Sequence, residues 1–461
     1  MNAKRRAASL LFGVLLAACA NTPTSSTPTP GPTATLSSPT APPRASASTT
    51  MPTPVPTPTA RPDPSPVPTT AASGLPAGWQ HELVCREDRY SGCGLHLHDA
   101  GGRDRPGWPT PLLAGWCGPE NVAVGTDGVA YVACTTEDER TVVSSFAVTG
   151  SSRPGWPVEA VGWTGPGKIL FVGPDDTVFV STMTGVDDRE FAVHAFRPDG
   201  HPRAGWPRTL PGVGQGFTLA PDGTVVGWWY EDPKEGTLDL QAARTKFTMI
   251  GPNGKTLPGR WPVTSIGTVT APVVTKDGSL FYTSATGKVW GHDRSGTIID
   301  GWPYRLPYNV RPELRPDGLL MFILGGWTAD DGTGSDSEVI VLTTAGRMAS
   351  GWPYRTNVSL DGPQCCADCY SYFPHAVSAD GTLYLAPWDE DGARVVALDR
   401  RGRVVTGWPY RLLPGWRVVA LEMGSAGRLV VGLRDCSAQS ECCDSDASRQ
   451  ITLTPAGELA P

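Results

Sequence analysis

The sequence predicts an all-β protein, a β-propeller of four-stranded antiparallel blades. A Trp-Pro pair recurs along the chain, and an Asp-Gly-like turn separates consecutive pairs. A glycine precedes each of these tryptophans by six residues, except at Trp261, where one residue is inserted between them. From Trp108 to Trp408 the repeat covers 300 residues in six steps, or 50 per step. Four short strands with their turns fill about that length. The repeat tryptophans are Trp108, Trp156, Trp206, Trp261, Trp302, Trp352 and Trp408.

Each repeat divides into short strand-forming stretches and turns. Alternating or apolar stretches, such as VIVLT (339–343) and VVALD (395–399), precede the glycine, and each Trp-Pro opens another short segment. The Asp-Gly-like turns, among them GTDG and RPDG, lead into β-branched and aromatic residues. Because no helical period competes with this pattern, one repeat is predicted to be one blade.

The repeated Trp-Pro pair is predicted to be structural. A tryptophan offers a large, rigid apolar face, which suits the contact between neighbouring blades. A proline fixes the backbone at the start of a strand and removes a donor there. Regular spacing in every repeat therefore favours blade packing over a row of ligand-stacking rings.

The propeller domain is predicted to span residues 75–461, with eight blades favoured and seven plus an extra hairpin as the alternative. LPAGWQ (75–80) resembles a GWP segment, and TPAGELAP (454–461) stops where a last blade needs one more strand. We expect the N-terminal strand to pair into the last sheet and close the ring, because closure hides two exposed edges.

Two segments, ALDRRG (397–402) and GHDRSG (291–296), resemble part of the tryptophan-docking motif of the quinoprotein-like, or PQQ-like, propeller repeats. In that family the tryptophan follows the glycine more closely, so the resemblance implies the fold rather than the chemistry. If the protein is an enzyme, the resemblance implies PQQ as its cofactor. Separately, the segment DDGTGSDSE (330–338) is rich in side-chain oxygens, which makes calcium another candidate ligand. We expect no cofactor and no metal.

The N-terminus predicts a lipoprotein. Three basic residues at 4–6 precede an apolar run at 7–18 that is too short to span a bilayer, so residues 1–18 read as a signal peptide. The run ends in LAAC, which resembles a bacterial lipobox and implies cleavage before Cys19 and its acylation, with palmitate among the lipids. Residues 19–74 are rich in Pro, Thr and Ser and predict a disordered tether that displays the propeller away from the outer face of a bacterial membrane.

Ten cysteines follow Cys19, an even number in an exported chain, so disulfides are expected. The spacing favours one bridge between Cys85 and Cys93, one between Cys117 and Cys134, and three between the remaining loops. Those loops contain Cys365, Cys366, Cys369, Cys436, Cys442 and Cys443.

The connections between strands predict two different ends of the propeller. The Asp-Gly-like turns and the Gly-to-Trp turns hardly vary in length and should lie at one end, which collects arginines. The other connections carry the insertions and many acidic residues, so we expect an acidic, disulfide-stapled face there. The candidate binding face consists of Trp228, Trp229, Trp327, Asp330, Asp331, Trp388, Asp389 and Asp391.

These patterns favour a binding or interaction scaffold in the cell envelope over an enzyme. No GxSxG, HExxH, P-loop or dinucleotide motif occurs, so no catalytic residue is assigned. One alternative is a quinoprotein-type oxidoreductase, which the pairs of adjacent cysteines suggest. The other is a carbohydrate-active lyase or hydrolase. We expect a monomer with an unidentified protein or glycan partner, held at the membrane by its lipid alone. No nucleic acid is expected, because no basic run with interleaved aromatics appears.

Overall fold

The structure is a computed structural model whose chain divides into two compact units, Met1–Ser65 and Pro66–Pro461. All described residues belong to the second unit, and every regular element among them is a β-strand. The described residues are 80–84, 93–98, 103–112, 115–164, 169–184, 190–211, 213–231, 243–325, 337–358, 360, 373–389, 392–424, 427–435 and 448–460.

The first four blades contain fifteen strands, all paired antiparallel with their neighbours. The first blade has three described strands and the next three blades have four each. These strands are β1 (Gln80–Val84), β2 (Gly94–His98) and β3 (Thr110–Pro111); β4 (Trp116–Val124), β5 (Ala130–Thr135), β6 (Arg140–Phe146) and β7 (Val158–Val161); β8 (Leu170–Val172), β9 (Val178–Thr184), β10 (Glu190–Phe196) and β11 (Arg208–Pro211); β12 (Val213–Leu219), β13 (Val225–Tyr230), β14 (Arg244–Ile250) and β15 (Val263–Ile266).

The last four blades repeat the same order. The seventh carries an additional short strand, β26, and the eighth has three described strands. These strands are β16 (Val273–Val274), β17 (Leu280–Thr283), β18 (Lys288–His292) and β19 (Tyr304–Arg305); β20 (Glu313–Leu314), β21 (Leu320–Leu324), β22 (Ser337–Leu342) and β23 (Tyr354–Thr356); β24 (His375–Val377), β25 (Leu383–Leu385), β26 (Trp388–Asp389), β27 (Gly392–Leu398) and β28 (Tyr410–Arg411); β29 (Trp416–Met423), β30 (Leu429–Asp435) and β31 (Ser448–Leu453).

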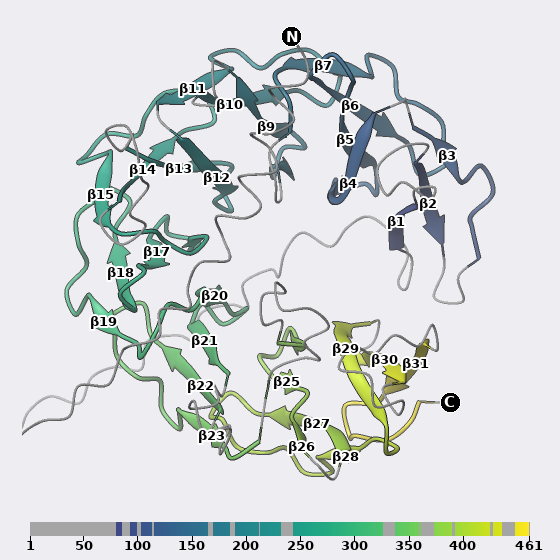
Figure 1. The fold of residues 1–461 in the computed structure, drawn as a ribbon, viewed down its shortest axis with the longest axis vertical. Helices are drawn as coiled ribbons and strands as arrows, with labels where there is room; N and C mark the ends of the chain where they lie inside the picture. The colour runs from purple at the N-terminus through teal and green to yellow at the C-terminus, as the bar shows by residue number, and fades with distance from the viewer. Residues whose placement is uncertain are drawn as a thin grey trace, which may run out of the picture. The chain divides into compact units, whose positions relative to one another are not determined.

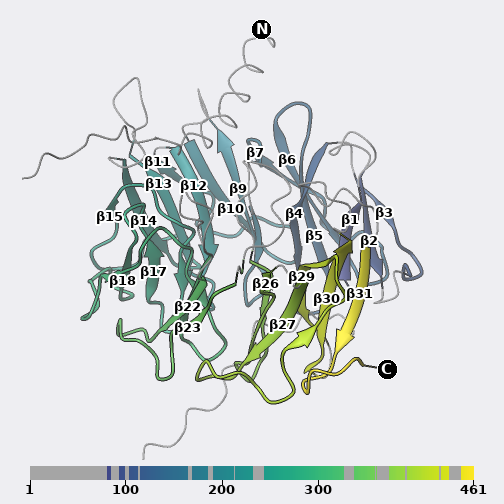
Figure 2. The same cartoon turned by 60° about the horizontal axis from the view of Figure 1, so that its bottom comes forward.

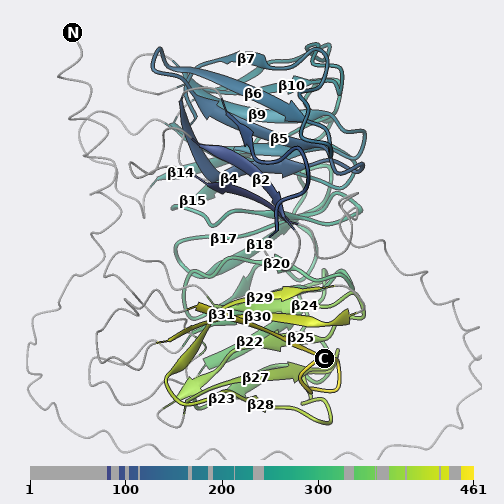
Figure 3. The same ribbon diagram turned by 90° about the vertical axis from the view of Figure 1, so that its right-hand side faces the viewer.

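The sheets follow one another around a ring, which confirms the predicted eight-bladed propeller (Figure 1). In a complete blade the first strand, such as β4, lies toward the centre and the last, such as β7, lies at the rim. Figures 2 and 3 turn the ring and show the strands of one sheet side by side. The described part of the N-terminal strand, β1, pairs with β2 in the first sheet, and residues 75–79 lie outside the described residues.

The repeat tryptophans join each blade to the next. Six of the seven are only 6–8% exposed, and Trp261 is half-buried. In every case the indole Nε1–H donates a hydrogen bond to a backbone carbonyl in the Gly-to-Trp turn of the following blade, two residues before its glycine. Each repeat tryptophan therefore both marks a position in the sequence repeat and contacts the next blade. All seven Trp-Pro peptide bonds are cis.

The glycines of the repeat lie where two backbones meet. Gly200 has a φ of +82°, and a Cβ there would stand 2.1 Å from the carbonyl oxygen of Gly155 in the preceding blade. Gly254 has a φ of +75°, and a Cβ there would stand 2.1 Å from the carbonyl oxygen of Gly205. A side chain at either position would strain the backbone and also displace the neighbouring blade.

Seven hydrophobic clusters fill the spaces between neighbouring blades. One example joins the second and third blades, where Trp156 packs edge-on against Tyr131 with ring centroids 5.4 Å apart, and Val180 lies in the same cluster. From the second to the seventh blade, strands in the middle of the blade contribute to clusters on both of their faces. The core is therefore a series of apolar layers arranged around the ring.

Candidate functional site

The two ends of the propeller differ as the connections predict. The turn end carries the Asp-Gly-like turns and the Gly-to-Trp turns. Contacts between them show that they lie at the same end: Arg203, in a Gly-to-Trp turn, forms an ion pair with Asp175, in an Asp-Gly-like turn, with 2.6 Å between Nη1 and Oδ2. The loop end carries the remaining connections, such as residues 136–139 and 161–164. Variable connections on a fixed scaffold are where binding residues usually lie, so the loop end is the candidate site.

Two members of the predicted binding face require correction. Trp228 and Trp229 lie within β13 and are only 7% and 5% exposed. Their rings point to opposite faces of the strand, Trp228 into the cluster shared with the fifth blade and Trp229 into the cluster shared with the third. Both are core residues because β13 is buried on both faces, and neither offers a ring to a ligand.

Trp388 keeps its place at the loop end. It begins β26, and the Cζ atom of Arg417 from the eighth blade lies 3.4 Å from the centroid of its ring. Such a cation–π contact ties the seventh and eighth blades together, and burial lowers the pKa of Arg417. Asp389 ends β26, where its backbone pairs with Gly392. Four further candidates lie outside the described residues, namely Trp327, Asp330, Asp331 and Asp391.

The structure adds exposed apolar residues that the sequence does not single out, and Leu413, 64% exposed and five residues after Trp408, is one of them. Trp116 is 68% exposed at the start of β4, and Val161 and Ile266 are 74% and 71% exposed at the loop-end termini of β7 and β15. Val161 and Ile266 both stand five residues after a repeat tryptophan, a regularity that could have identified them. Single exposed apolar side chains are common on protein surfaces, so the place of these residues at the loop end, and not their exposure alone, makes them candidates for binding.

A disulfide fixes the backbone beside Trp116. Cys117 and Cys134 are directly opposite each other on β4 and β5, with 4.4 Å between their Cα atoms, and they are bonded. This is the pairing that the sequence predicts. Cys93 is also disulfide-bonded, and the remaining predicted bridges involve residues outside the described ranges. The exposed indole therefore projects from a cross-linked hairpin.

The charges of the loop end are more balanced than the sequence suggests. Glu231 is paired with Lys246 and Arg244, and the hydrogen bond from Lys246 lowers the pKa of Glu231. Glu159 accepts a hydrogen bond from Arg140 with 2.8 Å between Oε2 and Nη1. Among the described residues, several acids of this end are therefore partly neutralised by cations on neighbouring strands.

The turn end is neutralised in the same way. Arg294 pairs with Asp222 at 2.7 Å, as Arg203 does with Asp175. Burial opposes ionisation of Asp175, but hydrogen bonds from Thr177 and Arg203 hold its pKa below the ordinary value. The arginines of this end serve in part to hold turns to each other, and their number overstates its positive charge.

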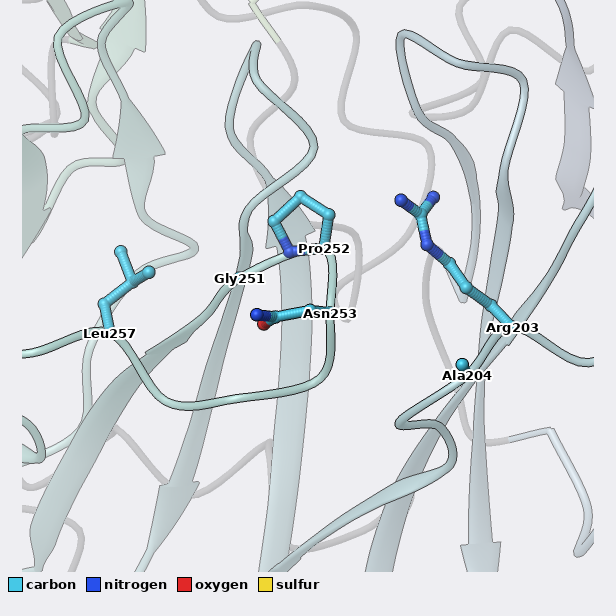
Figure 4. Close-up of a pocket in the computed structure, with 6 residues that line it drawn as sticks. All are labelled: Arg203, Ala204, Gly251, Pro252, Asn253 and Leu257. Carbon is cyan, nitrogen blue, oxygen red and sulfur yellow. The ribbon is translucent and has the colours of Figure 1, made fainter.

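An open depression of about 480 Å³ lies at the turn end, between the third and fourth blades. Figure 4 shows Arg203 along one side of it, across from Pro252 and Asn253, with Leu257 beyond. Because the guanidinium of Arg203 is already paired with Asp175, the depression lacks an uncommitted charge. Its shape follows from the two adjacent turns, and we assign it no ligand.

A half-buried ion pair joins the sixth and seventh blades. His375 on β24 lies with Nε2 2.6 Å from Oε2 of Glu313 on β20 and with Nδ1 2.7 Å from the carbonyl oxygen of Phe373. Both nitrogens thus face an oxygen acceptor, and a protonated ring can donate a hydrogen bond to each of them. Burial lowers the pKa of His375, but the hydrogen bond and charge of Glu313 outweigh it and raise the pKa overall.

Two kinds of feature are absent from the described residues. No group of three or more His, Cys, Asp or Glu side chains in these ranges is arranged to hold a metal ion. Within the described part of the chain, no helix is long and apolar enough to cross a membrane.

No protein-family model matches the chain, and no curated protein matches it. Solved structures do. BamB from Moraxella catarrhalis is 15% identical, with a TM-score of 0.40, and the match covers 83% of this chain and 95% of BamB. Dihydro-heme d1 dehydrogenase NirN is 13% identical, with a TM-score of 0.48 and coverage of 86% and 75%. The computationally designed Ika8 protein is 15% identical, with a TM-score of 0.45 and coverage of 77% and 94%. The strand pairings of the chain itself establish the propeller fold.

Proposed function

We propose that this protein is a lipid-anchored scaffold of the bacterial cell envelope that binds a protein or glycan partner through the loop end of its propeller. Cys19 carries the lipid on the outer face of the membrane, and residues 19–74 hold the propeller away from the bilayer. The signal-like residues 1–18 and the composition of the tether support this address.

The exposed indole of Trp116 is the observation that carries the proposal. A tryptophan that is 68% exposed beside the Cys117–Cys134 bridge combines a large contact area with a rigid base. Tryptophans are enriched among the residues that dominate binding energy, and a rigid site loses less entropy on binding. Disulfides in the other cysteine-rich loops would extend this rigid surface across neighbouring blades.

Binding by the purified protein tests the proposal. Immobilised protein is exposed to solubilised envelope proteins and to a glycan array, and the Trp116→Ala variant is compared with wild type. We expect the variant to lose at least about tenfold in affinity for whichever partner is retained. Leu459→Ser is the matched control, because Leu459 is 56% exposed at the turn end. Equal binding by wild type and Trp116→Ala would reject the loop end as the site.

The anchor is tested separately. Cells that produce the full chain are labelled with an alkyne analogue of palmitate, and the Cys19→Ala variant is compared. We expect label and membrane association only with Cys19 present. An unlabelled wild-type protein in the soluble fraction would reject the anchor without bearing on the binding surface.

A further inference from the structure

Three consecutive blades share a pentapeptide that the others lack. GWPYR occurs at 301–305, 351–355 and 407–411, in the fifth, sixth and seventh blades. Its arginines are Arg305, Arg355 and Arg411. At the same distance from the repeat tryptophan, the second, third and fourth blades have Glu159, Thr209 and Thr264. The propeller is therefore built equally well without an arginine at this position.

The shared arginines lie at the outer edge of the ring. They belong to β19, β23 and β28, which are the outermost strands of their blades and follow one another along the rim in Figure 1. All three side chains are exposed, Arg355 to 75%. The tyrosine before each arginine is half-buried and packs against the apolar clusters between blades, so each arginine is held on an anchored strand.

Like charges face each other on two of these edges. In the register of the fifth blade, Lys288 on β18 is directly opposite Arg305, and in the seventh, Arg394 on β27 is directly opposite Arg411. Neither Lys288 nor Arg305 forms an ion pair with another described residue. Like charges directly across an antiparallel pair repel each other, which natural sheets tolerate poorly. A bound anion would remove this repulsion.

The sixth blade provides an internal comparison. There the residue opposite Arg355 is Glu338, and the two form an ion pair with 2.8 Å between Nη2 and Oε1. The arrangement shows that an acid fits opposite the shared arginine without disturbing the strands. The cations in the fifth and seventh blades are therefore not a requirement of the sheet geometry.

We infer that this surface binds a flexible linear polyanion whose repeating charges are phosphate or carboxylate groups. The surface, called the arginine belt below, consists of Lys288, Arg305, Arg355, Arg394 and Arg411. Guanidinium groups pair with both kinds of oxyanion in a bidentate manner, and repeated sites suit a repeating ligand. The belt runs along the rim of three consecutive blades, which a flexible chain can follow and a flat membrane cannot. It lies on the outer strands beside the loop end, and it uses none of the residues that carry the proposed function.

Binding of long-chain inorganic polyphosphate and of polygalacturonate to the full mature protein tests the inference. We expect at least one of them to bind, with an affinity that falls as salt rises, since bound cations release counterions. Binding of polyphosphate alone would assign phosphate, and binding of polygalacturonate alone would assign carboxylate. Binding of neither polymer would overturn the inference.

Paired variants separate the belt from the general charge of the protein. Arg305→Ala/Arg411→Ala should weaken binding by at least about tenfold and lower the slope of log affinity against log salt by about one to two. Arg208→Ala/Arg260→Ala removes the same charge from exposed positions on the third and fourth blades and should have little effect. Equal losses in the two variants would overturn the inference.

Two further comparisons test the geometry. Glu338→Gln removes the acid opposite Arg355 and should tighten polymer binding, because the guanidinium then faces the ligand alone. An unchanged or weaker affinity would contradict the role of Arg355. Duplex DNA is also a polyanion, but it is too stiff to follow the rim. Equal affinity for duplex DNA and for the flexible polymer would overturn the assignment to a flexible chain.

Discussion

The contact between each repeat tryptophan and the following blade can be tested at Trp156. Its indole Nε1–H donates to the carbonyl oxygen of Pro198 at 3.0 Å, and its ring is 7% exposed. Trp156→Phe keeps an aromatic ring but removes the donor and part of the buried volume. The lost hydrogen bond costs about 1 kcal/mol and the vacated space about 1–2 kcal/mol, so unfolding should become easier by about 2–3 kcal/mol.

The assay is denaturant unfolding followed by circular dichroism, which the loss of one fluorophore does not disturb. Trp116→Phe is the matched control, because Trp116 is 68% exposed and its replacement should change the free energy of unfolding by less than about 0.5 kcal/mol. If the two variants unfold at the same denaturant concentration, the repeat tryptophans do not hold the blades together and the reasoning fails.

Three further predictions follow from single sites. Gly254→Ala places a Cβ 2.1 Å from the carbonyl oxygen of Gly205 and should lower the free energy of unfolding by at least about 3 kcal/mol. Gly318→Ala is the control, because Gly318 has a similar φ but nothing within 4 Å of the added Cβ, and it should lower the free energy of unfolding by about 1–2 kcal/mol. Equal melting temperatures of the two variants would contradict this expectation. Cys117→Ala/Cys134→Ala opens a bridge between residues 17 apart and should cost about 3 kcal/mol in unfolding experiments, and no change on its removal would count against the bridge. The pKa of His375 is raised in the folded protein, so its pairing with Glu313 stabilises the fold fully at a pH below the ordinary histidine pKa of about 6.5. This stabilisation is lost as the pH rises through the pKa of His375 in the folded protein. The difference in unfolding free energy between about pH 5.5 and about pH 8.5 should therefore shrink in His375→Gln.

Much of the architecture could be predicted because the repeat is local in sequence. A glycine with a positive φ, a tryptophan six residues later and an Asp-Gly-like turn recur in most blades, and each has a local physical cause. Cys117 and Cys134 could be paired from their places at neighbouring strand ends. The bridge follows directly from the register of β4 and β5.

The candidate site could be predicted less well because burial depends on neighbouring blades. Trp228 and Trp229 stand beside a long insertion and read as loop residues, yet both faces of β13 are covered by adjacent blades. Trp116 has the same side chain but is 68% exposed at the start of β4. Side-chain identity alone does not distinguish these cases.

The charge balance was also hidden from local patterns. Arg294 and Asp222 are 72 residues apart and meet only because turns of neighbouring blades lie at the same end. Counting charges by connection type therefore exaggerated the contrast between the two ends. Ion pairs of this kind become visible only when the blades are arranged in space.

Crosslinking in the producing bacterium tests the central claim most directly. A photo-reactive phenylalanine analogue replaces Trp116 at the loop end or, in a second strain, Leu459 at the turn end, both in the full-length protein. We expect a discrete crosslinked species from position 116 and none from position 459. A species from position 459 alone, or the same species from both positions, would contradict binding through the loop end.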